Sequence, residues 1–150
     1  MKQPVLWTVW LALAFASAQS GAALYQQNCV FCHGEKGQGR AGAFPPQAGH
    51  TPDVLKAPGG RAQLINTLLY GMQGEIMVKG QKYNGVMPAF AQLTDEQLAN
   101  VLNYILTAWG NDKLLPPDFK PLTAAEIAAA RNTKLPPQQV GANRAQLNVP

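Results

Sequence analysis

The sequence is short of features that define several large classes of protein. Only 13% of its 150 residues are charged, about half of the roughly 25% usual in soluble proteins, and no apolar run reaches the roughly 18 residues that span a bilayer. The hydrophobic fraction, 47%, is nevertheless ordinary. The composition therefore argues against a disordered chain and a polytopic membrane protein, and the length corresponds to one domain.

Cysteine is especially scarce, with two residues, Cys29 and Cys32. They allow at most one disulfide, and a loop this short would contribute little stability. The pair is therefore expected to serve chemistry. Basic residues are also few: 12 Lys and Arg against 8 Asp and Glu, without a basic run, argue against nucleic-acid binding.

The first 18 residues have the pattern of a secretory signal peptide. Met1-Lys2 supplies a positive charge, the apolar segment 5–15 follows, and Ala16 and Ala18 are the small residues of a cleavage site after Ala18. The alternative is an uncleaved anchor helix, but the apolar segment is short for a span and no basic residues follow it. Cleavage would lower the formal net charge from +4 to +3. We therefore expect a mildly basic, periplasmic protein.

Hydrophobic spacing and capping signals predict the remaining elements. The clearest is a helix over 94–110, which starts at the capping box Thr94-Asp-Glu-Gln97. The Gly- and Pro-rich stretch 34–60 is expected to be irregular, and either disordered or wrapped around something. The other predicted elements are helices over 21–28, 61–71, 123–130 and 138–147 and a small hairpin of 75–78 and 82–83, separated by Gly80. Asn84-Gly85 is a further turn signal.

One pentapeptide, Cys29-Val30-Phe31-Cys32-His33, holds both cysteines and one of the two histidines. Cys-x-x-Cys-His is the attachment signature of c-type haem. Two thiols on one helical turn can reach the two vinyl groups of the porphyrin, and the adjacent imidazole is then held where it can bind iron. Because thioether attachment is made outside the cytoplasm, the export signal supports this interpretation independently. We expect one covalent haem c on Cys29 and Cys32, with His33 as an iron ligand.

Three other uses of the motif fit the sequence less well. A thioredoxin-like redox pair would follow a strand, and none is predicted before Cys29. A zinc site needs four ligands, and outside the motif only His50 remains, at a spacing unlike known zinc fingers. A structural disulfide suits the exported compartment but leaves His33 unexplained.

A six-coordinate iron needs one more ligand, for which His50, Met72, Met77 and Met87 are the candidates. Met72 follows the end of a predicted helix, and Met77 lies in a predicted strand where packing is the simpler role. Met87 lies in the segment 84–90, expected to be irregular, and a loop fixed by a turn and a proline can present a sulfur to a pocket. Met87 is therefore the predicted sixth ligand.

These motifs together resemble the class I cytochromes c. Gly21 and Tyr25 precede the first haem cysteine by eight and four positions, as in that family, where they meet the C-terminal helix. Pro45 stands where the family has a proline whose carbonyl accepts the histidine N–H, although Gln47 replaces the usual leucine. The resemblance implies an all-α class I cytochrome c fold, with N- and C-terminal helices crossing and helices around one covalently bound haem, plus a small β-hairpin.

A closer resemblance covers nearly the whole mature chain. Segments 42–50, 68–71, 82–87 and 107–110 are similar to the soluble monohaem cytochromes c of extremely thermophilic bacteria. The resemblance implies a cytochrome c domain over 19–110 and a C-terminal extension over 111–150 that wraps the same domain; a partly mobile terminus is the alternative. It also implies electron transfer from a bc1-type complex to a ba3-type terminal cytochrome c oxidase.

An electron carrier, not an enzyme, is the expected function. With His33 and Met87 bound, iron would keep no open position for oxygen, peroxide or nitric oxide. We expect a monomer that docks through an apolar patch at the haem edge, bounded by Lys36, Lys79 or Lys82. Two alternatives stay open: the haem-bearing subunit of an exported dehydrogenase, and a gas-binding or peroxidase haem protein, which requires a weak or absent Met87 bond.

Overall fold

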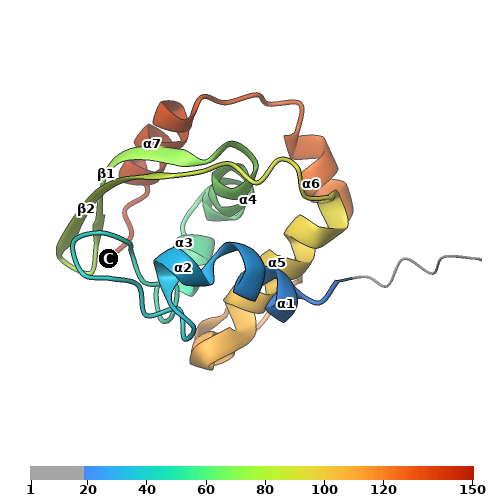
Figure 1. Ribbon diagram of the computed structural model, residues 1–150, viewed down its shortest axis with the longest axis horizontal. Helices are drawn as coiled ribbons and strands as arrows, with labels where there is room; N and C mark the ends of the chain where they lie inside the picture. The colour runs from blue at the N-terminus through green and yellow to red at the C-terminus, as the bar shows by residue number, and fades with distance from the viewer. Residues whose placement is uncertain (1–18) are drawn as a thin grey trace, which may run out of the picture.

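The computed structural model describes residues 19–150, and the predicted signal peptide lies outside the described residues. A two-stranded antiparallel sheet lies at one side of the molecule, and helices form the rest (Figure 1). Between residues 19 and 150, no helix has the length and apolar character needed to cross a bilayer. The elements are α1 (Gly21–Asn28), α2 (Val30–His33), α3 (Thr51–Lys56), α4 (Gly60–Tyr70), β1 (Met72–Val78), β2 (Gln81–Met87), α5 (Asp95–Thr107), the 3₁₀ helix η1 (Ala108–Leu114), α6 (Ala124–Ala130) and α7 (Pro137–Gln146).

Helices α1 and α5 pack across one another, as the class I resemblance implied. Gly21 makes the crossing possible, because a Cβ there would lie 2.7 Å from the Cβ of Tyr104 and would also overlap the Asn100 carbonyl. The ring of Tyr25 lies 5.6 Å from that of Tyr104 and 4.9 Å from that of Trp109, centroid to centroid. This crossing forms the centre of the main apolar core.

The hairpin closes at Gly80, where the sequence predicts that its two strands separate, and the strands extend further than predicted. Lys79 and Gly80 form a two-residue loop with φ of 50° and 78°, the positive values that a tight hairpin turn requires. The register from this loop pairs Asn84 with Glu75 and ends with Met87 opposite Met72. The turn predicted at Asn84-Gly85 was therefore wrong, and Met87 ends a strand instead of lying in an irregular segment.

Two other boundaries also differ from expectation. The stretch 34–60 is largely irregular as predicted, but its end folds into α3, where a proline stands in the first turn. The helix predicted to reach Gly110 ends at Thr107, because Trp109 and Gly110 have φ of 55° and 85°, which no α-helix accommodates.

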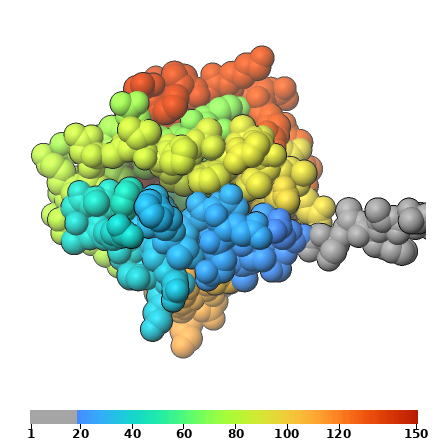
Figure 2. Space-filling model, in the orientation of Figure 1, coloured from blue at the N-terminus to red at the C-terminus, as the bar shows by residue number. Residues whose placement is uncertain are grey.

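Residues after 110 run back along the other elements, and the red segments at the top of Figure 2 lie against the green and yellow-green part of the chain, where α7 contacts β1 and α4. Arg61 of α4 holds Glu126 of α6, with a shortest N–O distance of 2.6 Å. Arg131 bonds Asp95 at 2.6 Å and also donates to the carbonyls of Ala91 and Leu93, at 3.0 and 2.7 Å. The last forty residues are thus fastened to α4 through Arg61, and to the start of α5 and the segment before it through Arg131.

Candidate functional site

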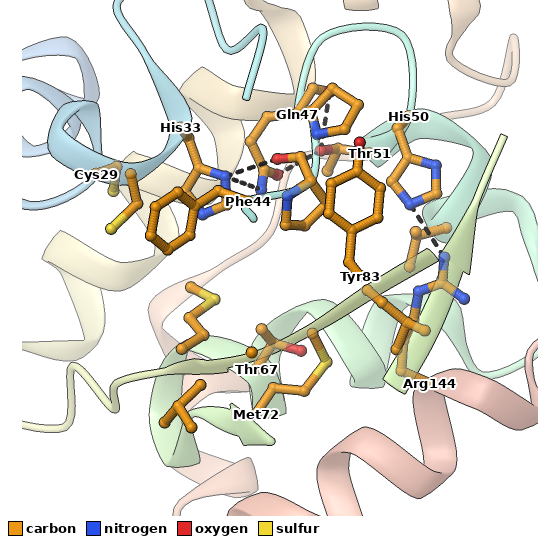
Figure 3. Close-up of a pocket in the computed structure, with 18 of the residues that line it drawn as sticks. Cys29, His33, Phe44, Gln47, His50, Thr51, Thr67, Met72, Tyr83 and Arg144 are labelled. Carbon is orange, nitrogen blue, oxygen red and sulfur yellow. Dashed lines mark hydrogen bonds between the residues drawn. The ribbon is translucent and has the colours of Figure 1, made fainter. Parts of the chain in front are cut away.

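A cavity that opens to solvent lies between the Cys29–His33 turn and the hairpin (Figure 3). One wall comes from residues 28–33 and 43–54, and the opposite wall comes from the two strands; α4 and α7 complete the lining. Its surface is mostly apolar. An apolar cavity between two such walls suits a flat, hydrophobic cofactor.

Both cysteines lie at one end of this cavity. Cys29 caps α2, and the amides of Cys32 and His33 donate to its carbonyl oxygen at 3.2 and 2.9 Å, so that all three side chains come from one helical turn. The thiols are not joined in a disulfide. Burial, and secondarily the charge of Cys32, raises the pKa of Cys29 to about 11. This thiol is therefore protonated at neutral pH, unlike the low-pKa thiol of a thioredoxin-like pair.

The zinc alternative does not fit the arrangement of side chains. In the part of the chain that the structure describes, no three His, Cys, Asp or Glu residues gather into a metal-binding group. The element before Cys29 is helix α1, so the strand of a thioredoxin-like motif is also missing from residues 19–28.

His33 is held in one orientation by its Nδ1 atom, which lies 2.9 Å from the carbonyl oxygen of Pro45. A carbonyl can only accept, so Nδ1 carries the proton and Nε2 keeps a free lone pair. Burial lowers the pKa of His33, and the bond to Pro45 acts in the opposite direction. The result is a neutral imidazole with one nitrogen available to a metal, as the resemblance implied for Pro45.

Gln47 adds a second contact to the same ring, with its amide 3.1 Å from Nδ1. The amide atom nearest the ring is Nε2, and Oε1 faces the Thr51 hydroxyl, which lies within donating distance of Oε1 at 2.8 Å and of the Gln47 main-chain carbonyl at 3.1 Å. Gln47, which departs from the family's usual leucine, thus packs against the His33 ring.

Two methionines face the cavity from the hairpin. Met72 and Met87 are directly opposite each other in the register, on the same face as the buried Ile76 and Tyr83, and both line the cavity. Met77 lies in a strand as predicted, but the packing role expected for it was wrong, because 48% of its surface is exposed. It does not line the cavity, which also argues against a role as ligand. The structure therefore narrows the thioether candidates to Met72 and Met87.

His50 lies at the opposite end of the cavity from Cys29, and its ring already has a hydrogen-bond partner. Its Nε2 is 3.0 Å from Nη2 of Arg144, which must be the donor. Burial, together with the nearby positive charge of Arg144, lowers the pKa of His50 to about 4. His50 is thus a neutral acceptor bound to a cation, which makes it a poor candidate for the sixth ligand.

Sequence reasoning missed two residues that build this site. Arg144 stands in a polar helix with no local signal of burial, yet it is 5% exposed and lines the cavity. Asn111 is fully buried and accepts from the Gly49 amide at 2.7 Å while donating to the carbonyls of Gln47 and Ile105. Asn111 therefore fixes the loop that carries Gln47 and His50.

The residues present fit a covalent haem. Two thiols at one end, an imidazole with a free Nε2 on one wall and two thioethers on the other are the ligand types that c-type haem requires. The apolar lining between them suits a porphyrin.

Comparisons with known proteins agree with this fit. The profile of the family described as Cytochrome c matches residues 18–109. A cytochrome c-552 of Thermus thermophilus is 56% identical over 137 residues, which are 91% of this chain and 90% of the relative. A second cytochrome c-552 of that species is 56% identical over 129 residues, which are 86% of this chain and 97% of that relative. The cytochrome c subunit of a quinone alcohol dehydrogenase from Gluconacetobacter polyoxogenes is 33% identical over 135 residues, which are 89% of this chain and 27% of that longer protein.

Proposed function

The chain belongs to the cytochrome c family, and from this premise we propose that it is a periplasmic monohaem carrier between a bc1-type complex and a ba3-type terminal oxidase. Membership implies one covalently bound haem c with its iron, and an electron transfer protein instead of an enzyme. The observation that carries the proposal is the single apolar cavity that gathers both cysteines, His33 and Met87.

Each of these residues has a distinct role in the proposal. Cys29 and Cys32 would attach the porphyrin through thioethers, and His33 and Met87 would bind its iron. The bound haem supplies a one-electron change between ferrous and ferric iron. The Pro45 carbonyl, 2.9 Å from Nδ1, keeps the His33 ring oriented and makes Nε2 a stronger donor to the metal.

The surroundings of the cavity favour the reduced form. Thioether sulfur prefers Fe(II), and apolar walls disfavour the additional positive charge of Fe(III), so both raise the reduction potential. With two protein ligands on the metal, the chain leaves small gases no open position. Both features suit outer-sphere transfer.

We propose that partners dock on an apolar surface at the mouth of the cavity. Phe31, between the two cysteines, is 79% exposed, and Val86, beside Met87, is 64% exposed. The charge available for docking is small. Lys82 pairs with Glu75 at 3.1 Å, and the two propionates of a haem would lower the net charge of the mature protein from +3 to about +1. A small, transient interface of under about 1,200 Å², formed by a monomer, is therefore expected.

We also propose that export removes residues 1–18, that residues 19–110 form the cytochrome c domain and that residues 111–150 are an extension of it. The family profile ends at residue 109, and α6 and α7 lie on α5, α4 and β1, which supports this division.

The functional test is oxidation by the proposed acceptor. Reduced holoprotein, mixed in a stopped-flow instrument with purified ba3-type oxidase in air, is expected to lose its reduced haem absorption at a rate that saturates with oxidase. A rate no faster than with heat-inactivated oxidase contradicts the assignment of this acceptor.

A second candidate is favoured by the likeness to dehydrogenase cytochrome subunits. In that case the chain would accept electrons from a catalytic partner in a stable complex. Co-purification of the natively expressed protein with a dehydrogenase, and reduction by its substrate, would favour this candidate over the freely diffusing carrier.

A further inference from the structure

Arg144 is a buried cation that the protein does not neutralise. It is 5% exposed, and none of the four ion pairs found among residues 19–150 includes it. Its recorded hydrogen bonds within this range use Nη2 alone, toward His50 at 3.0 Å and the Met77 carbonyl at 3.5 Å. A charge in such a place normally has an anionic partner, because desolvation without one is costly.

Packing, not chance, sets the position of this guanidinium. Helix α7 rests directly on β1, since a Cβ on Gly141 would overlap the Gln73 carbonyl. The side-chain amide of Gln63 donates to the Val140 carbonyl at 3.1 Å, and Val140 is fully buried. Arg144 follows one turn later and is therefore delivered into the cavity wall by a fixed helix.

His50 orients the guanidinium from the other side. Its loop is fixed by Asn111, which accepts from the Gly49 amide at 2.7 Å. Nε2 of His50 accepts from Arg144, so Nδ1 of His50 carries the proton. Among the described residues, this Nδ1 is the buried side-chain atom that has no hydrogen-bond partner. A neutral histidine and an arginine together form a donor-rich corner in a mostly apolar cavity.

This corner lies at the opposite end of the cavity from the haem-attachment cysteines. Figure 3 shows Cys29 at one side and Arg144 with His50 at the other, with His33 and Phe44 between them. In haem the two vinyl groups and the two propionates occupy opposite edges of the porphyrin. Attachment of the vinyl edge at Cys29 and Cys32 therefore directs the carboxylate edge toward Arg144.

We propose that Arg144, oriented by His50, binds a haem propionate, so that the C-terminal extension supplies the counter-charge of the cofactor. The proposal rests on the haem-binding part of the proposed function and does not depend on which oxidase or donor is used. The propionate would be the anionic partner of the buried guanidinium, and it would accept charge-assisted hydrogen bonds from Nε or Nη1 of Arg144.

The direct test is a crystal structure of the holoprotein. A propionate oxygen within about 3.2 Å of a guanidinium nitrogen of Arg144 is the expected result. Two propionates that bond only other groups or water would overturn the proposal.

Variants provide a second, spectroscopic test. Redox-induced infrared difference spectra report the carboxylate bands of the propionates. Arg144→Gln is expected to shift these bands and Arg144→Lys to shift them less, whereas Lys120→Gln, which removes an equal charge from an exposed position of the same extension, should leave them unchanged. Identical bands in Arg144→Gln and the unchanged protein would overturn the proposal.

Two measurements distinguish failure of this inference from failure of the proposed function. The mass of each purified variant reports covalent haem, and the methionine-to-iron charge-transfer band reports the axial ligands. Unshifted propionate bands in a protein with covalent haem and this band overturn only the role of Arg144. Absence of covalent haem from the unchanged protein, expressed with a haem-attachment system, overturns both.

Discussion

Gly21 of α1 lies against Asn100 of α5 so closely that a methyl group on the glycine would overlap the Asn100 carbonyl oxygen. The same methyl group would stand 2.7 Å from the Cβ of Tyr104. Both obstacles belong to a rigid helix, so neither can move aside cheaply.

Gly21→Ala is therefore expected to destabilise the protein by about 1–3 kcal/mol, the usual cost of overpacking a core contact. Urea unfolding of the holoprotein, followed by far-ultraviolet circular dichroism, measures the effect. Ala22→Ser, at the adjacent exposed position, is the control and should change little. Equal stability of Gly21→Ala and the control would mean that the helices do not cross at this contact.

Met87→Ala is expected to remove the sixth ligand. The methionine-to-iron charge-transfer band should disappear, the reduced protein should bind carbon monoxide, and the reduction potential should fall by on the order of tenths of a volt, within the roughly 0.8 V that axial ligands span. Met72→Ala is the matched control, because the two residues pair across the hairpin and line the same cavity. If Met72→Ala produces these changes and Met87→Ala does not, the ligand assignment is reversed.

Glu126 makes stability depend on pH. Its hydrogen bond to Arg61 lowers its pKa from 4.5 to about 2. A carboxylate with a depressed folded-state pKa contributes stability that is complete above pH 4.5 and is lost as the pH falls toward 2. Because the side chain is 37% exposed, solvent screening reduces the contribution to about 1 kcal/mol.

Urea unfolding at pH 7, 4.5, 3 and 2 measures this contribution. Glu126→Gln should be less stable than the unchanged protein at pH 7, and the difference should shrink through this window. Asp118→Asn, an exposed acidic position in the same extension, provides the control. A difference between the Gln variant and the unchanged protein that stays constant from pH 7 to pH 2 would show that the ion pair with Arg61 contributes nothing.

Ile127 of α6 is fully buried in the main core, where it packs among residues of α4 and α5. Ile127→Ala should cost about 2–4 kcal/mol in the free energy of unfolding, and Ile127→Val about 1 kcal/mol. Chemical denaturation of both variants measures the series. A loss below about 0.5 kcal/mol in the Ala variant would mean that the extension folds separately from the core.

Turnover with a ba3-type oxidase should depend little on salt. Raising the ionic strength from low to physiological values is expected to change kcat/KM by less than about threefold, because the holoprotein carries little net charge to steer encounter. Phe31→Ser should lower kcat/KM more than Lys36→Gln does, since Phe31 is 79% exposed beside the cavity. A steep decline with salt would indicate electrostatic docking instead.

Local signals predicted the helices well because each begins or ends at a residue with its own chemistry. The capping boxes at Thr94 and Thr123 are both formed, and Gly71 ends α4 with a φ of 73°. The hairpin was predicted to separate at Gly80, and it does, but the additional turn signal at Asn84-Gly85 was wrong because both residues pair with β1.

The residues of the candidate site also differ in how far the sequence predicts them. The spacing of Cys29, Cys32 and His33 predicts that they lie together, because one helical turn is enough to bring them together. Arg144 could not be identified, because its burial depends on how α7 settles on a hairpin some seventy residues earlier. Contacts of that range leave no periodic trace in the sequence.

The three bonds of Arg131 have a further consequence for the segment between Met87 and α5. That segment is tied to α4 through the Phe90 amide and the Leu68 carbonyl, 2.7 Å apart, and to the extension through the Ala91 and Leu93 carbonyls. A loop anchored from two sides cannot swing away by itself, so we expect that detachment of Met87, the proposed iron ligand, would require release of the extension. Heating should therefore abolish iron–sulfur ligation and helical structure in one transition, without an earlier ligand-exchanged state.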